Sequence, residues 1–244
     1  VQTSKFTWDI ALNMSTNKNK LVKLIEGVDN FIFTTTNSGV AEVWATVGGG
    51  YGDIYATTYE RNESGDIVVT DAGLFRAAAE KKLVGNYQPD WVGGLTNTLT
   101  YGKISLRFLI DARIGGEVYS GTDAGLDATG VSERSLEYRD GGVVIDGVRT
   151  NGFPNTVNIS SQQYWNSYSG IGENYIFDQT NIRMREAALY YELPARLTEG
   201  SFIKGLTVGL TGRNLFFFYR ALENFDTEGS FSVSNFAQGV LFYT

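Results

Sequence analysis

Residues 6–15 read Phe-Thr-Trp-Asp-Ile-Ala-Leu-Asn-Met-Ser, and apolar and largely polar side chains alternate along this stretch without a break. Successive side chains of a β-strand point to opposite faces of the sheet, so this alternation predicts a strand with one apolar face. A tilted strand of about ten residues is also long enough to cross a lipid bilayer. The stretch therefore predicts either a strand of a soluble β protein or a membrane-spanning strand of a β-barrel.

The same alternation returns farther along the chain. In residues 104–114 the apolar positions are separated by Ser105, Arg107, Asp111 and Arg113, and only Leu109 is out of phase. A third segment near 206–213 alternates in the same way. The complete set of predicted spanning strands lies near 5–14, 43–59, 91–101, 103–114, 176–192, 204–219 and 236–243.

Local irregularities modify this pattern at three places. The apolar phase shifts within residues 182–193, and a β-bulge near Arg185 or Glu186 would restore it. Residues 19–26 and 74–82 are the two segments whose composition favours a helical turn or two.

The connections between the predicted strands are of unequal length. Gly102 marks a tight hairpin and residues 193–203 form a short turn, whereas 60–90 and 115–175 are long. If the strands alternate in direction, the two long connections lie together on one side of the sheet. The segment 15–42 then falls on the side of the short turns. Short turns on one side and long loops on the other are typical of outer-membrane barrels.

Aromatic residues gather near the ends of the predicted strands, as in the girdles of membrane barrels. With this assignment of directions, the side of the short turns carries Tyr101, Tyr190 and Tyr191, and the opposite side carries Trp8, Phe216, Phe218 and Tyr219. For any one of these residues an ordinary half-buried strand position is the first interpretation, and it is their clustering at strand ends that favours girdles.

Composition excludes several classes of function. The 244 residues carry a formal net charge of −7 and contain no cysteine and no histidine. Phosphate binding requires a basic surface, so nucleic acid is not an expected partner. Without cysteine the chain can form no thiolate metal site, and without histidine it lacks the commonest metal ligand and the commonest general base. Acidic stretches at 123–127 and 140–146 do not have the spacing of an EF-hand, so we predict no metal site there. Because most catalytic constellations need histidine or cysteine, we also predict no cofactor and no enzymatic activity.

Two long runs of sequence resemble a known family. Residues 180–194 read Thr-Asn-Ile-Arg-Met-Arg-Glu-Ala-Ala-Leu-Tyr-Tyr-Glu-Leu-Pro, and residues 205–216 read Gly-Leu-Thr-Val-Gly-Leu-Thr-Gly-Arg-Asn-Leu-Phe. Together with 17–24 and 85–99, they are similar to the C-terminal barrel region of the SusC-like TonB-dependent outer-membrane transporters of Bacteroidetes. The four matches follow one another in order at consistent spacing.

The resemblance implies an all-β fold, namely about seven antiparallel strands of a transmembrane barrel of about 22 strands with long extracellular loops. Residues 1–244 would be the C-terminal portion of that barrel, with the plug and the N-terminal domains outside this chain. It also implies location in the outer membrane, in contact with lipid. The expected partners are the remainder of the barrel with its plug, a SusD-like surface lipoprotein, and the TonB complex acting through the N-terminal part. The implied activity is active import of a large nutrient, either an oligosaccharide or a peptide.

Candidate site residues lie in two regions. The 115–175 connection is the best candidate for substrate or lipoprotein contact, because aromatic faces stack on sugar rings and pack at protein interfaces. Packing of the loop on itself is an equally plausible role for each of its aromatic residues. The aromatic candidates are Tyr119, Tyr164, Trp165, Tyr168 and Tyr175. The residues expected to face a barrel lumen are Arg107, Asp111, Arg113, Arg183, Arg185 and Arg213.

Two other classes of protein compete with the transporter. A secreted, soluble β-sandwich that binds carbohydrate would use the same alternation and the same aromatic residues. A glycoside hydrolase is disfavoured, because the sequence does not place two carboxylates at a defined separation on strand ends. Barrel and sandwich differ in where the apolar strand faces point. In a barrel they meet lipid, and in a sandwich they meet each other as a core.

Overall fold

The computed structural model describes residues 2, 5–36, 38–200, 202–203 and 205–222. These residues form two compact units. The first, here called the sheet unit, comprises residues 2–17, 89–115 and 179–221. The second, the insertion unit, comprises residues 18–88, 116–178 and 222. The predicted strand at 236–243 lies outside the described residues.

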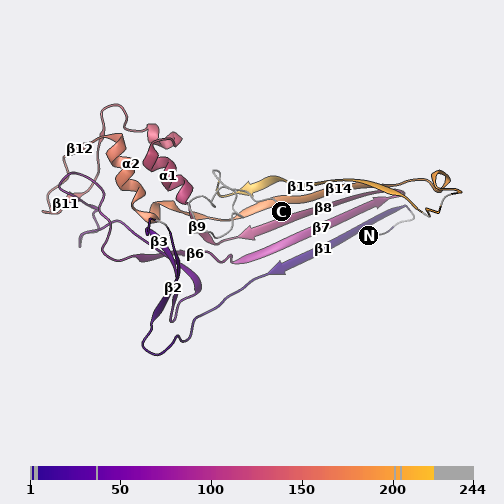
Figure 1. Ribbon diagram of the computed structural model, residues 1–244, viewed down its shortest axis with the longest axis horizontal. Coiled ribbons are helices and arrows are strands. Elements are labelled where there is room, and N and C mark those ends of the chain that lie inside the picture. Colours follow the sequence, from indigo (N-terminus) through magenta and orange to yellow (C-terminus); the bar gives the residue numbers. More distant parts are fainter. Residues whose placement is uncertain (1, 3–4, 37, 201, 204, 223–244) are drawn as a thin grey trace. The chain divides into compact units, whose positions relative to one another are not determined.

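The sheet unit is a five-stranded antiparallel sheet of long strands in the order β1-β7-β8-β14-β15 (Figure 1). Five of the seven predicted segments are thereby confirmed as strands of one sheet. Their bounds are β1 Phe6–Ser15, β7 Trp91–Tyr101, β8 Ile104–Ile114, β14 Asn181–Glu192 and β15 Thr207–Arg220. The prediction at 176–192 was too long, because Ile176–Asp178 form a separate strand of the insertion unit.

The register gives the sheet one apolar and one polar face. On one face a single row runs across all five strands, from Trp8 through Leu99, Leu106 and Leu189 to Leu210. The adjacent row on the other face consists of Asp9, Thr98, Arg107, Ala188 and Thr211. Directly opposite residues of antiparallel strands share a face, so the alternation in the sequence becomes a property of the whole sheet.

Two short turns lie at one end of this sheet and two long connections leave it at the other. Gly102, with φ +59°, turns the chain between β7 and β8, and residues 193–206, including η3 (Ala195–Leu197), join β14 to β15. Residues 16–90 and 115–180 both depart from the opposite end, where Val92 pairs with Ser15 and with Arg113. The predicted asymmetry is confirmed for the described strands.

The prediction of a spanning strand at 43–59 is wrong. That segment contributes to a hairpin of two short strands, β3 (Ala41–Thr46) and β4 (Tyr51–Ala56), within the insertion unit. Because no strand of the five-stranded sheet lies there, segment 15–42 belongs to the same long connection as 60–90, and not to the side of the short turns. Strand β1 therefore runs in the direction opposite to the predicted one. Trp8 consequently lies near the short turns, two residues from the Phe6–Tyr101 pair.

The β-bulge predicted in β14 is confirmed. Against β8, Met184 pairs with Ile110 and Glu186 pairs with Leu109, so Arg185 is the extra residue. The bulge shifts the phase of the strand by one, which keeps Ala187 on the same face as Met184.

The insertion unit contains a second sheet and several two-stranded pairs. The sheet has the order β2-β3-β4-β6, with β2 at Asn30–Thr35 and β6 at Lys82–Asn86. The pairs join β9 (Glu117–Tyr119) to β13 (Ile176–Asp178), β10 (Val143–Val144) to β12 (Asn158–Ile159), and β5 (Val68–Val69) to β11 (Val148–Arg149).

Two α-helices lie in the long 115–175 connection, where the sequence reading placed none. Helix α1 (Gly121–Thr129) begins after Ser120, whose hydroxyl accepts from the Asp123 backbone N–H, and it ends at Gly130 with φ +71°. Helix α2 (Ser161–Ser169) begins at a capping box between Ser160 and Gln163. Short 3₁₀ helices follow at η1 (Glu133–Leu136) and η2 (Gly172–Tyr175). The segments 19–26 and 74–82, predicted as helical turns, form no helix.

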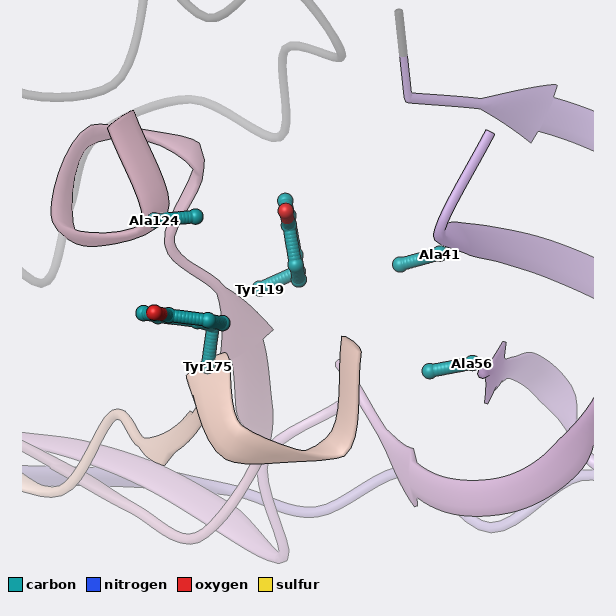
Figure 2. Close-up of a cluster of buried hydrophobic side chains, with 5 residues drawn as sticks. All are labelled: Ala41, Ala56, Tyr119, Ala124 and Tyr175. Carbon is teal, nitrogen blue, oxygen red and sulfur yellow. The ribbon is translucent and has the colours of Figure 1, made fainter. Parts of the chain in front are cut away.

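A buried cluster joins the strands and helices of the insertion unit. Figure 2 shows Ala41 and Ala56, from β3 and β4, pointing toward the ring of Tyr119, with Ala124 of α1 and Tyr175 of η2 on its other side. Small side chains from the sheet leave room for two tyrosine rings, whose centroids lie 6.4 Å apart.

In the described part of the chain, no helix is long and apolar enough to cross a membrane.

Candidate functional site

The six charged residues expected to face a lumen come together on the polar face of the sheet unit. Arg107, Asp111 and Arg113 alternate along β8, and Asp111 pairs with Arg183 of the neighbouring β14. Arg213 of β15 lies opposite Glu186. Register alone therefore assigns five of the six to one face of three adjacent strands.

Arg185, the bulge residue, reaches the same face through its guanidinium group. Its Nε donates to Asp111 Oδ2 at 2.8 Å, and its Nη1 donates to Asn214 Oδ1 at 2.9 Å. Asn214 has φ +50°, so both strands depart from regular geometry at this point. The bulge aims a cation across β8 and β15 at once, and it links three strands through one side chain.

A second ion pair and an aromatic contact extend this polar face. Arg213 Nε lies 3.1 Å from Glu186 Oε2. Farther along β14 and β15, the guanidinium of Arg183 lies over the ring of Phe217, with 4.3 Å between Cζ and the ring centroid, and Arg220 lies over the same ring at 5.6 Å. Cations over an aromatic face are stabilised by the ring quadrupole. The face thus carries a connected set of charges, as a hydrated surface would.

The opposite face of the same sheet is apolar and open. Leu12 and Met14 of β1 are 64% and 66% exposed, and Leu210 of β15 is 78% exposed. An apolar face of this extent marks a surface that meets lipid or another protein.

The five aromatic candidates of the insertion unit are brought together, but mostly in its interior. Tyr119, Trp165 and Tyr175 are buried, which argues against direct contact with a ligand for these three. Tyr164 and Tyr168 are half-buried, and their rings stack with centroids 5.7 Å apart and planes 16° apart. These two tyrosines are the members of the set with surface left to offer a partner.

A buried polar network that the sequence did not reveal holds this aromatic cluster in place. Asp127 is 1% exposed, and its carboxylate accepts from Ser132 Oγ at 2.6 Å, from Arg134 Nε at 2.9 Å and from Tyr175 Oη at 2.7 Å. The Arg134 guanidinium also lies 5.5 Å from the ring centroid of Trp165. One carboxylate therefore ties α1, η1 and η2 together.

Electrostatics within this network follow from burial and from the Asp127 charge. Burial raises the pKa of Tyr175 strongly, and the hydrogen bond to Asp127 raises it further. Burial lowers the pKa of Arg134, but its hydrogen bond and charge interaction with Asp127 outweigh that effect and leave the pKa raised. Burial, together with the neighbouring Tyr138, raises the pKa of Tyr164 to about 12. All three groups thus keep their ordinary protonation states at neutral pH, which suits a structural role.

A pocket of about 500 Å³ lies where α1 ends and α2 begins, and Asp127, Arg139, Ser161 and Trp165 contribute to its lining. The Arg139 guanidinium donates to the backbone carbonyls of Gly130 and Ser135, so it closes the turn after α1. Among the described residues, no three His, Cys, Asp or Glu side chains could jointly hold a metal ion.

Comparison with known proteins identifies proteins of similar sequence. No family model matches. TonB-dependent receptor P3 of Formosa agariphila is 24% identical over 240 residues, covering 89% of this chain and 23% of that protein. TonB-dependent receptor P26 of the same organism is 25% identical, covering 98% of this chain and 26% of the relative. The chain is related to the TonB-dependent receptors. The resemblance seen in the sequence is thereby confirmed.

Solved structures agree with this relationship at the level of the fold. The RagAB peptide importer in its closed-closed state aligns with a TM-score of 0.61 at 17% identity, covering 98% of this chain and 26% of that chain. A second structure of the RagAB peptide transporter gives a TM-score of 0.56 at 16% identity. The chain is an all-β segment of an outer-membrane protein, as the sequence predicted. It spans 23% and 26% of the lengths of receptors P3 and P26. These relatives are receptors and transporters, not enzymes.

Proposed function

We propose that residues 1–244 form the C-terminal part of the barrel wall and the extracellular loops of a TonB-dependent transporter that imports a nutrient too large for porins. One observation carries the proposal. The five long strands present an open apolar face and a charged face, with short turns at one end and long insertions at the other. In an outer-membrane barrel the apolar face meets lipid and the polar face lines the interior.

The charged residues on the polar face then have a definite role. Arg107, Asp111, Arg113, Arg183, Arg185 and Arg213 would line the lumen, and five of these six are cationic. Arginines outnumber the carboxylates Asp9, Asp111 and Glu186 on this face, so the wall would attract anionic groups on a passing substrate or on the plug.

The open apolar face also disfavours the secreted sandwich. In a β-sandwich the apolar faces of two sheets meet and bury each other, which leaves such side chains inaccessible. Leu12, Met14 and Leu210 are each more than half exposed in the described structure. A soluble protein would not leave this surface uncovered.

The substrate class in this proposal is an oligosaccharide or a peptide. RagAB, which shares the fold, is a peptide transporter. The stacked pair Tyr164 and Tyr168 is the part of the insertion unit that would contact a substrate or a SusD-like surface lipoprotein, because its rings are half-buried. Other required partners are the remaining barrel strands, the plug, and TonB, which would couple import to the proton gradient.

Two measurements test the proposal separately. First, the protein is extracted from its native membrane and compared boiled and unboiled on a denaturing gel, with an antibody against this segment. A compact band that shifts to a far larger mass on boiling supports the barrel, and a soluble species without a shift overturns it.

Second, uptake of labelled oligosaccharide and peptide mixtures is compared among the parent strain, a deletion strain, and a strain that lacks TonB. Import that disappears equally in both mutant strains supports the transporter and identifies its substrate class. Import that persists in both strains for every substrate overturns the transport function, even if the protein is a barrel.

A further inference from the structure

An exposed basic and apolar segment connects β1 to the first strand of the insertion unit. Residues 18–25 read Lys-Asn-Lys-Leu-Val-Lys-Leu-Ile and form neither helix nor strand. Val22 and Ile25 are each 82% exposed. Three lysines interleave with these side chains, and all three are exposed. Exposed apolar side chains mark an interaction surface when several of them are contiguous.

The backbone of this segment is nevertheless fixed. Leu21 exchanges two backbone hydrogen bonds with the turn between β3 and β4, donating to Gly49 O at 2.9 Å and accepting from Gly48 N at 2.7 Å. Asn19 accepts from the Tyr51 backbone N–H and donates to Gln88 Oε1 at 3.0 Å. The segment therefore presents Val22 and Ile25 from a tethered backbone, and the exposure of these residues follows from the fold of the insertion unit.

Further exposed apolar side chains adjoin the segment. Phe31 and Phe33 of β2 are 53% and 45% exposed, and the ring of Phe33 lies 5.1 Å from that of Tyr51. Tyr51 is itself 46% exposed and is bonded to Asn19 through its backbone. Aromatic rings beside lysines are the composition that anchors proteins at the boundary between lipid and water. We call Lys18, Lys20, Lys23, Val22, Ile25, Phe31, Phe33 and Tyr51 the basic–apolar patch.

The charge of the patch contrasts with that of the chain. No acidic residue occurs between Asp9 and Glu26, whereas the chain as a whole carries a formal net charge of −7. None of the three lysines takes part in an ion pair with another described residue. Their ammonium groups are therefore available to an anionic surface.

The covalent chain ties the first residue of this patch to the end of β1. Strand β1 ends at Ser15, and Lys18 follows three residues later, so the two Cα atoms are at most about 10 Å apart. We propose that the basic–apolar patch binds the anionic headgroups of the outer leaflet, with the lysines on lipid phosphates and with Val22 and Ile25 inserted into the acyl boundary. This contact goes beyond nutrient uptake, because it concerns the lipid-facing exterior and not the lumen.

The test measures where the side chain at position 25 resides. The full-length protein, in a background without other cysteines, carries Ile25→Cys labelled with an environment-sensitive fluorophore. It is placed in nanodiscs of phosphatidylcholine alone or of an equimolar mixture with phosphatidylglycerol. In the anionic nanodiscs we expect quenching by a lipid-attached nitroxide and protection from aqueous iodide. Replacing Lys18, Lys20 and Lys23 by Gln is expected to weaken the contact about fivefold per lysine.

A matched control is Val131→Cys, which lies 68% exposed after α1 in the same unit and has no lysine beside it. Its label should stay accessible to iodide in both nanodiscs. Equal iodide access at positions 25 and 131 in anionic nanodiscs would overturn the proposal. Protection at position 25 from both quenchers would also overturn it, because the patch would then be covered by protein. Uptake is measured separately, so neither result decides the transport function.

Discussion

The buried carboxylate of Asp127 provides the sharpest test of how the insertion unit is held together. It accepts hydrogen bonds from Ser132, Arg134 and Tyr175, which belong to segments up to 48 residues away. In Asp127→Asn the side chain keeps its shape, but one of its two acceptor atoms becomes an N–H₂ donor that faces other donors. Each oxygen of Asp127 accepts one bond from Arg134, so in either orientation of the amide one Arg134 bond is lost, together with the bond donated by Ser132 or by Tyr175 and the negative charge.

The magnitude follows from the bonds that are lost. A neutral hydrogen bond contributes about 1 kcal/mol and one to a charged partner about 1.5–3 kcal/mol. The side chain of Arg134 is 40% exposed, so water offsets part of its loss. The expected cost is about 2 kcal/mol for local opening of α1 and η1, which corresponds to about thirtyfold faster amide exchange.

Hydrogen exchange of the full-length protein in detergent, read by mass spectrometry on peptides from 116–178, measures this effect. Tyr175→Phe removes a single bond from the same carboxylate and should accelerate exchange about fivefold. Peptides from the sheet unit serve as the internal reference and should not change. Unaltered exchange around α1 in Asp127→Asn would refute the assigned role of the network, and equal acceleration in the sheet unit would show a general loss of folding.

Three further outcomes follow from the structure. Leu12→Arg on the apolar face should lower the free energy of unfolding by about 2–4 kcal/mol, measured by urea titration in lipid. Ala11→Arg on the opposite face should lower it little. Similar losses at both positions would contradict the assignment of faces. Ser160→Ala should cost α2 about 1 kcal/mol, seen as faster exchange confined to that helix. The raised pKa of Tyr164 means that the folded state holds this proton more tightly than the unfolded chain, so its contribution to stability is complete below pH 10 and is lost as the pH rises toward 12. Alkaline unfolding of Tyr164→Phe should shift upward accordingly, and an unchanged midpoint would contradict the burial of this hydroxyl.

The sequence predicted the sheet unit well because its information is local. Each feature that determines it can be read from a few neighbouring residues. These features are the alternation in 6–15 and 104–114, the glycine at the hairpin and the phase shift at Arg185. The hairpin within 43–59 was missed because two short strands read as one, although Gly48-Gly49-Gly50 marked the turn between them. The capping box at Ser160 and Gln163 was a readable signal for α2.

The interior of the insertion unit could not be predicted in the same way. Asp127 and Tyr175 are partners across 48 residues, and neither carries a local mark of that partnership. The aromatic residues of 115–175 lie close together in the structure, but aromatic composition does not distinguish a binding surface from a core. Burial decides the matter, and burial depends on which helices and strands the chain folds over them. Whether Tyr164 and Tyr168 contact a substrate stays a prediction.

The bulge at Arg185 shows how one residue serves both faces of the sheet. In an unbroken strand, Glu186 would share a face with Met184, and Ala187, Leu189 and Tyr191 would turn toward the charged face. The bulge instead places Glu186 opposite Arg213, keeps Leu189 opposite Leu106 and Leu210, and directs the Arg185 guanidinium onto Asp111. A carboxylate is thereby removed from the apolar face, and three strands gain a polar link on the charged face. Since the same residue restores the apolar alternation and completes the charged cluster, deleting it would disturb the apolar face and the charged face together.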